Sequence, residues 1–252
     1  MRKAVAVVTS VPLVISLFFT IPANAAAPID YHYWKLQQPD GLAISSSQLL
    51  AGYHSVYFYR TGRGQAFMDT KTGTVTTHSE HPRTELIEQL RGSDTAWDWT
   101  GTNSMTNRAA VTLQGGPNGS TTIGQIFNND NSIPLVELEY EAEPNSAGGN
   151  FTVLYEECKG HGTYTKSSMK IALRSQFTYA LSLSHGVATV SINGVQIFSH
   201  KPSTSLKGKN FYFKCGDYDQ TATQGPVITV PYTIVELYNV TLLHDPPASG
   251  SR

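Results

Sequence analysis

The stretch ATVSINGVQIF, residues 188–198, decides the fold class. Two runs rich in β-branched residues flank Asn193-Gly194, and an Asn-Gly pair supplies the positive φ angles of a two-residue type I′ turn. The stretch therefore predicts a β-hairpin. Similar short runs, separated by Gly, Asn, Pro and Ser, recur from residue 55 to residue 243. So many short strands predict an all-β domain made of two packed sheets.

The other expected strands follow from the same alternation of apolar and polar residues. They cover residues 55–60, 84–90, 109–113, 121–127, 135–141, 151–157, 168–173, 179–184, 210–215 and 233–243. Residues 44–50 fit either a short helix or a turn, and the Gly-, Asn- and Pro-rich stretches 115–120, 144–150 and 220–226 are expected surface loops. None of these loops is long enough to separate two domains.

The N-terminus has the pattern of an export signal. Two basic residues at positions 2 and 3 precede an apolar run, residues 4–21, and the small residues Ala23-Asn24-Ala25 follow it. These features predict a signal peptide over residues 1–25 and a single secreted domain over residues 26–252. No second run approaches the roughly 20 apolar residues that a membrane span needs.

Charge and cysteine content limit the partners. A formal net charge of −1 argues against nucleic acid and anionic membranes, which select broadly basic surfaces. Any polyanion must therefore meet a local basic site, and we expect a monomer. In an exported chain, Cys158 and Cys215 predict a disulfide, with two buried thiols as the alternative.

The segment FYFKCGDYDQ, residues 211–220, separates a packing face from a polar face. Successive side chains in a strand point to opposite sides. The packing face takes Phe211, Phe213 and Cys215, and the polar face takes Tyr212, Lys214, Tyr218 and Gln220. The polar face is either a binding surface or the outer side of an ordinary amphipathic strand.

Two further segments carry polar groups on expected strands. In HPRTELIEQL, residues 81–90, the same alternation puts His81, Arg83, Glu85 and Gln89 on one face. An arginine held by carboxylates presents a rigid fork to a carboxylate ligand, although a mixed face of this kind also suits plain solvation. In TIGQIF, residues 122–127, the amide of Gln125 interrupts a run that otherwise favours a strand.

Taken in order, these segments resemble the three motifs of the alginate-lyase-type jelly-roll polysaccharide lyases. The motifs are Arg83-Thr84-Glu85-Leu86, then Gln125-Ile126, then Tyr212-Phe213-Lys214-x-Gly216-x-Tyr218-x-Gln220, with the Asn-Gly hairpin between the last two. Within this group the sequence is most similar to the glucuronan lyases, which act on β-1,4-linked glucuronic acid. The resemblance implies a jelly roll of two antiparallel sheets, with a concave cleft for an acidic polysaccharide that is cleaved by β-elimination.

The resemblance also implies roles for the residues. Gln125 and Arg83 would hold the substrate carboxylate, and Tyr218 would transfer the protons, with Lys214 or Arg83 lowering its pKa. The remaining substrate-binding residues would be Lys214, Tyr212, Glu85 and Gln220. No cofactor and no catalytic metal are required, and loop oxygens near residues 128–131 are compatible with a structural calcium.

Phe127 departs from the pattern of the resembled enzymes. Many alginate lyases of this group carry a histidine two residues after the motif glutamine, where this chain has Phe127. A single tyrosine suffices when H5 and O4 leave from the same side, as in β-linked glucuronate or mannuronate, so the change favours these over guluronate. His81 is the candidate for a second proton-transfer or carboxylate-binding group, with His78 and His54 as weaker ones. Because His81 precedes a proline, it also fits a turn.

Two other functional classes remain open. The first is a glycoside hydrolase, because Glu137, Glu139, Glu141 and Glu143 alternate along one strand face. Since residues between them form an apolar inward face, these glutamates are expected on a solvated outer strand. The second is a non-catalytic carbohydrate-binding jelly roll, in which Trp97 and Trp99 either stack on sugar rings or are buried. An unsaturated uronate product distinguishes a lyase from both.

Overall fold

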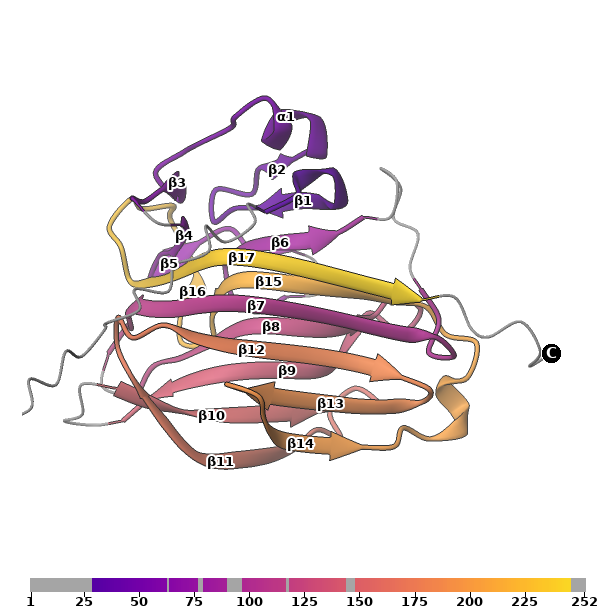
Figure 1. The fold of residues 1–252 in the computed structure, drawn as a ribbon. Helices are drawn as coiled ribbons and strands as arrows, with labels where there is room; N and C mark the ends of the chain where they lie inside the picture. Colours follow the sequence, from indigo (N-terminus) through magenta and orange to yellow (C-terminus); the bar gives the residue numbers. More distant parts are fainter. Residues whose placement is uncertain are drawn as a thin grey trace, which may run out of the picture.

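The computed structural model describes residues 29–62, 64–76, 79–89, 97–116, 118–143 and 148–245. The predicted signal peptide, His78, part of the predicted loop 144–150 and the end of the predicted strand 84–90 lie outside these residues. Within them, the chain forms two antiparallel sheets that pack face to face (Figure 1). The expected all-β sandwich is confirmed.

The first sheet has eight strands among the described residues, in the order β11-β10-β9-β8-β15-β6-β1-β2. Their bounds are β1 (Trp34–Gln37), β2 (Ala43–Ile44), β6 (Thr84–Glu88), β8 (Ser120–Asn128), β9 (Ile133–Ala142), β10 (Gly148–Tyr155), β11 (Thr163–Ala172) and β15 (Phe211–Asp219). We call it the cleft sheet, because the polar segments that are expected to face the substrate cleft lie on its outer face.

The second sheet, which we call the back sheet, has seven strands in the described part of the chain, in the order β14-β13-β12-β7-β17-β4-β3. Their bounds are β3 (Phe58–Arg60), β4 (Gln65–Asp69), β7 (Thr102–Leu113), β12 (Phe177–Ser184), β13 (Val187–Ile192), β14 (Val195–His200) and β17 (Thr233–Asp245). The short strands β5 (Thr72–Gly73) and β16 (Thr223–Gln224) pair in parallel, and two 3-10 turns cover Tyr31–Tyr33 and Thr204–Leu206.

The inner faces of the two sheets form one hydrophobic core. Along β12, every second residue is buried, and β15 contributes Phe211, Phe213 and Cys215 to the core from the other sheet. Burying each large apolar side chain stabilises the fold by roughly 1.5–3 kcal/mol. Because the apolar residues of the cleft sheet point inward, its polar residues gather on the opposite, outer face.

Local sequence signals account for the turns. Strands β13 and β14 form the predicted hairpin, with φ of 49° at Asn193 and 78° at Gly194. Residues 44–50 include the α-helix α1 (Ser46–Leu50), which Ser45 and Gln48 start with a reciprocal capping box. In the described part of the chain, no helix is long and apolar enough to cross a membrane.

Among the described strands of four or more residues, two were not predicted from the sequence. Strand β1 has four residues, too few to show an alternation, and β4 is buried at every position. Strand β1 pairs with β6 in register Lys35↔Ile87. This pairing matters for the site, because it brings Lys35 to the face that carries the polar residues of β6.

The predicted disulfide between Cys158 and Cys215 is wrong, since both cysteines are free. Cys215 is fully buried between the sheets, on the packing face of β15. Cys158 lies beyond the end of β10 and is exposed. The two thiols therefore occupy separate environments, and the alternative of a buried thiol holds for Cys215 alone.

Candidate active site

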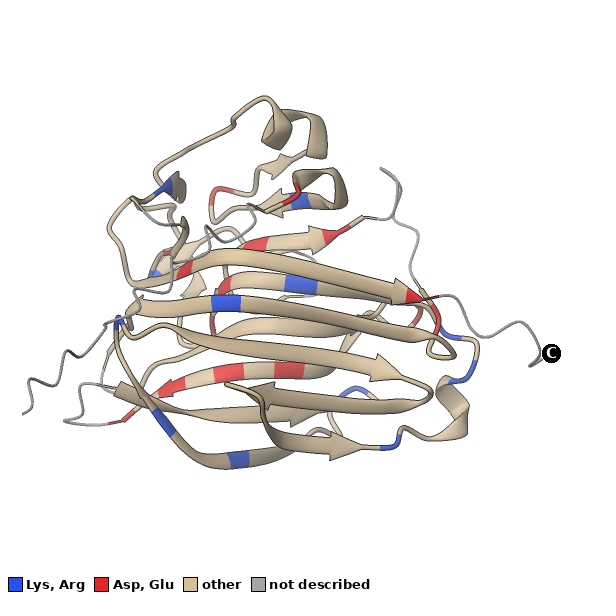
Figure 2. Cartoon of the chain, in the orientation of Figure 1, with Lys and Arg blue, Asp and Glu red and all other residues tan. Residues whose placement is uncertain are grey.

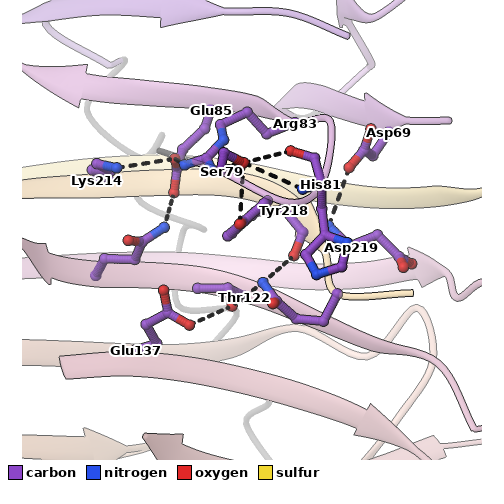
Figure 3. A network of polar contacts seen from close by, with 12 residues as sticks. Asp69, Ser79, His81, Arg83, Glu85, Thr122, Glu137, Lys214, Tyr218 and Asp219 are labelled. Carbon is purple, nitrogen blue, oxygen red and sulfur yellow. Dashed lines mark hydrogen bonds and ion pairs between the residues drawn. The ribbon is translucent and has the colours of Figure 1, made fainter. Parts of the chain in front are cut away.

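The polar residues of three neighbouring strands form a row across the outer face of the cleft sheet. Lys214 on β15 pairs with Gln125 on β8, and Gln125 pairs with Glu137 on β9. Residues directly opposite each other in a sheet point to the same face. The row therefore places an ammonium group, an amide and a carboxyl group side by side. Figure 3 shows its two ends, Lys214 and Glu137.

Glu85 organises the centre of this row. Its side chain is fully buried and accepts hydrogen bonds from Gln125 Nε2 at 2.6 Å and from Arg83 Nη1 at 3.1 Å. Lys214 Nζ lies 3.9 Å from the same carboxylate. One negative charge thus orients two cations and one amide, which leaves a net positive charge for a ligand. Glu85 was predicted to bind substrate, and its burial instead suits a role in holding Arg83 and Gln125.

Tyr218 reaches this group through an irregularity in β15. The register of β15 against β8 shifts between Cys215 and Tyr218, and Gly216 in this bulge has φ of 146°. A Cβ atom at Gly216 would lie 2.5 Å from the carbonyl oxygen of Thr84, so only glycine fits. The Tyr218 ring then packs against Arg83, whose guanidinium carbon is 3.7 Å from the ring centroid.

Ser79, which sequence reasoning missed, connects Arg83 and Tyr218. Its hydroxyl accepts a hydrogen bond from Arg83 Nη2 at 2.5 Å, donates to the carbonyl of His81 at 2.7 Å and lies 3.3 Å from the Tyr218 hydroxyl. Ser79 is in a loop rather than on a predicted strand, so no alternation could point to it.

His81 lies next to Tyr218, with the two ring centroids 5.9 Å apart. Its Nδ1 is 2.6 Å from the carbonyl oxygen of Ala222, which can only accept, so Nδ1 carries a proton. Whenever the ring is neutral, Nε2 is then its acceptor nitrogen, and among the described residues no hydrogen bond to Nε2 occurs. His54 lines a separate pocket with Tyr31, Tyr53 and Tyr59 and is not part of this network.

The prediction that the glutamates of β9 lie on a solvated outer face is wrong for Glu137 and Glu139. Glu137 and Glu139 are each only 7% exposed, and they contact Thr122 and Ser120 of the neighbouring strand β8. Figure 2 shows the acidic residues alternating along β9. Gln220 Nε2 donates to Thr122 Oγ1 at 2.9 Å, and Thr122 Oγ1 donates to Glu137 Oε2 at 3.4 Å. The face of β9 is therefore part of the site.

Burial shifts the proton affinities of the site. It raises the pKa of Glu137 to about 8, helped by Glu139 and Glu85, and it lowers the pKa of Lys214 to about 8 against the pull of Glu85. Burial also raises the pKa of Tyr218, and the opposing charge of Arg83 only limits that rise. The expected net lowering of the Tyr218 pKa by nearby cations is thus not found.

A pocket of about 370 Å³ opens beside these residues on the outer face of the cleft sheet. Three cationic side chains line it, from Lys35, Arg83 and Lys214. Phe127 and Tyr212 supply an apolar wall, with their ring centroids 5.2 Å apart and Lys214 Nζ 3.8 Å from the Phe127 centroid. A chain of nearly neutral charge therefore has the local basic site that a polyanion needs.

Other candidate residues serve the fold. Trp97 and Trp99 are buried, and Trp97 Nε1 donates to Glu88 at 2.9 Å, so neither ring is an open platform for sugar stacking. Near the proposed calcium loop, Asn128 Oδ1 accepts backbone hydrogen bonds from Asp130 and Asn131. No group of three or more metal-binding side chains occurs among the described residues, and a structural calcium stays a prediction.

Known proteins resemble this chain in sequence and fold. The family model described as alginate lyase matches residues 29–244, while no curated protein matches. An alginate lyase from Pseudomonas aeruginosa is 27% identical with a TM-score of 0.77, over 86% of this chain and 100% of that one. The alginate lyase A1-II′, of polysaccharide lyase family 7, is 28% identical with a TM-score of 0.73, over 86% and 96%. With its motifs gathered on one sheet face and its family model spanning the domain, this chain belongs to the alginate lyase family.

Proposed function

We propose that the protein cleaves β-1,4-linked polyglucuronate by β-elimination, with Tyr218 as the group that takes the proton from C5 and then gives it to O4. The observation that carries the proposal is the placement of the Tyr218 ring against Arg83, beside a carboxylate-binding group that contains no second proton-transfer residue at position 127. Phe127 contacts Lys214 through its ring and cannot exchange protons.

The first step is binding of the uronate carboxylate. Arg83, Gln125 and Lys214 would surround it with donors that Glu85 already holds in place. Neutralising the carboxylate makes the C5 proton acidic, because the charge that develops on deprotonation spreads onto the carboxylate oxygens. The preorganised donors then stabilise that charge without having to reorganise.

Proton transfer and bond cleavage follow. Because burial raises the pKa of Tyr218, only its ionised fraction acts as the base. Its oxygen takes the proton from C5, a double bond forms between C4 and C5, and the C4–O4 bond breaks. The departing O4 then receives the proton from Tyr218, which returns the phenolate. Arg83, packed on the ring face, stabilises the ionised tyrosine. The products are one chain with a new hydroxyl end and one with an unsaturated uronate end.

This use of one residue as base and then acid requires H5 and O4 to lie on the same side of the sugar. Glucuronate and β-linked mannuronate meet that requirement, whereas guluronate requires a second group. His81 is the nearby alternative, with Nδ1 committed to Ala222 and Nε2 free to accept. Its ring would assist Tyr218 rather than replace it.

Polymannuronate, the β-linked part of alginate, is the second candidate substrate. The family match and the alginate lyases among the similar structures favour it, and its stereochemistry is the same at C4 and C5. Solved complexes of A1-II′ with product and with substrate use variants in which a tyrosine is replaced by phenylalanine. A tyrosine is also the group to which we assign proton transfer.

The test is ultraviolet absorbance of the unsaturated product, with wild type and Tyr218→Phe each offered glucuronan, polymannuronate and polyguluronate. We expect the largest signal on glucuronan, none on polyguluronate, and loss of signal in the variant. Product from polymannuronate alone would select the second candidate. Product from polyguluronate alone would overturn the single-tyrosine mechanism, and no product from any polymer would favour a carbohydrate-binding protein.

A further inference from the structure

Glu137 differs in its contacts from the other glutamates of β9 and from Glu143, which follows the strand. Glu139 accepts a hydrogen bond from Ser120 at 2.7 Å, and Glu141 and Glu143 pair with lysines of β11 at 2.9 and 2.8 Å. Among the described residues, the only hydrogen-bond partner of Glu137 is Thr122, at a long 3.4 Å. Glu137 is thus a buried carboxyl group whose capacity for hydrogen bonding is largely unused.

Glu137 lies on the outer face of the cleft sheet, in the row of polar residues that contains Gln125 and Lys214. Glu137 is the direct cross-strand neighbour of Gln125, one strand further from Arg83. Through Thr122 it is also connected to Gln220, two residues after Tyr218. A polysaccharide that binds Gln125 and extends towards β9 would therefore lie within reach of this carboxyl group.

The surroundings favour the neutral acid. Burial is the main cause that raises the pKa of Glu137 to about 8, and two nearby carboxylates act in the same direction. The charged and titratable groups that act on it or feel it come from four strands, namely Glu139 on β9, Arg83 and Glu85 on β6, Lys214 and Tyr218 on β15, and Tyr164 on β11. At neutral pH the carboxyl group keeps its proton and has an O–H group to donate.

We propose that neutral Glu137 is a substrate-binding residue that donates a hydrogen bond to a carboxylate of the acidic polysaccharide, next to the position held by Gln125. The inference rests on the proposed function, because it requires a polyuronate in this cleft. A neutral acid can bind a carboxylate by donating its proton, whereas the ionised form repels it. The same residue would therefore bind the polymer at neutral pH and weaken its binding at alkaline pH.

Lys214 must be separated from this effect, because its pKa is also about 8 and loss of its charge would weaken binding too. Arginine keeps its charge throughout this range, so Lys214→Arg leaves Glu137 as the group that titrates near pH 8. Tyr218→Phe prevents turnover and permits equilibrium binding. The experiment therefore compares Tyr218→Phe/Lys214→Arg with the same variant carrying Glu137→Gln, whose amide stays a neutral donor at every pH.

The measurement is calorimetric titration with a hexasaccharide of the polyuronate that wild type cleaves, at pH 6 and pH 9. We expect Kd to rise about tenfold between these pH values with Glu137, the size of one charge-assisted hydrogen bond, and less than twofold with glutamine. Glu137→Leu, which has no donor, should bind about tenfold more weakly than the glutamine variant at pH 6. Thermal unfolding of each variant verifies that it is folded.

The outcomes separate the two proposals. An equal rise in Kd with glutamate and glutamine, or equal binding by the leucine and glutamine variants at pH 6, would overturn the role of Glu137 alone. If wild type produces no unsaturated ends from any polyuronate and no oligosaccharide binds, the proposed function fails, and the role of Glu137 fails with it.

Discussion

The two flanks of the cleft accommodate buried charge in opposite ways. On the flank formed by β1, β6 and β15, the cations Lys35, Arg83 and Lys214 line a pocket, and one buried carboxylate, Glu85, holds two of them. On the β9 flank, Glu137 has no cation within ion-pairing distance among the described residues and keeps its proton instead. The first flank therefore presents positive charge to a polyanion. On the second flank, protonation of Glu137 removes a negative charge that would repel it.

The difference shows that residue type alone does not give the charge of a site. A count of formal charges on the outer face of the cleft sheet would balance the glutamates of β9 against the cations of β6 and β15. Because burial disfavours ionisation of Glu137, the face is more positive at neutral pH than the count suggests. Three predictions test this contrast, beginning with the change of largest expected effect.

The first prediction concerns a substitution that weakens the cationic flank. Arg83→Lys should lower kcat/KM roughly 100- to 1,000-fold, because lysine cannot hold Glu85 and a substrate carboxylate with one rigid fork. Initial rates of unsaturated product formation measure the loss. The matched control is Arg60→Lys, an exposed arginine at the end of β3, which should leave the rate within twofold of wild type. Similar losses in both variants would contradict a special role for Arg83.

The second prediction concerns the cost of the neutral carboxyl group. The folded-state pKa of Glu137, about 8, lies above the ordinary value of 4.5, so its ionisation in the unfolded chain favours unfolding as pH rises. Glu137→Gln should therefore raise the free energy of unfolding by up to about 3 kcal/mol at pH 7, with the gain absent below pH 4.5 and levelling off near pH 8. Urea unfolding at several pH values measures it.

Glu143→Gln is the control for that experiment. The pKa of Glu143 is lowered by its hydrogen bond to Lys170, so the glutamine variant should gain no stability at any pH. If both variants were stabilised alike between pH 5 and pH 8, general repulsion along β9 would explain the gain better than burial of one carboxyl group.

The third prediction addresses the C-terminal end of β9, where Glu141 pairs with an exposed lysine of β11. The Lys166–Glu141 pair, with side chains 58% and 28% exposed, should contribute less than about 1 kcal/mol to stability. A double-mutant cycle with Lys166→Ala and Glu141→Ala, in low and high salt, measures this coupling. A coupling above about 2 kcal/mol would mean that ion pairs, rather than protonation of carboxyl groups, offset the repulsion among the glutamates of β9.

Sequence reasoning predicted what depends on local alternation. The hairpin at Asn193-Gly194 and the shared face of Lys214 and Tyr212 follow from backbone geometry over a few residues, and the structure agrees. It also anticipated the gathering of Arg83, Gln125 and Tyr218, although that came from resemblance to known motifs. The resemblance supplied contacts between strands that alternation cannot give.

The misses have a common physical origin in long-range packing. Alternation identified the two faces of β9, but it could not show that Glu137 on the polar face is buried rather than exposed to water. Lys35 reaches the pocket only because β1 pairs with β6, and Ser79 contacts Arg83 and Tyr218 from a loop. The disulfide prediction was wrong for the same reason, because the number of cysteines in the sequence does not show which thiol points between the sheets.

The two unpaired thiols also make the protein convenient to label. Cys158 is exposed beyond β10, whereas Cys215 is sealed in the core, where burial raises its pKa well above the ordinary value. A thiol-reactive dye should therefore attach at one position in the native protein and at two after unfolding. Without any engineered cysteine, a fluorophore at Cys158 would provide a reporter remote in sequence from the cleft motifs, suited to following how the enzyme moves along a polysaccharide chain.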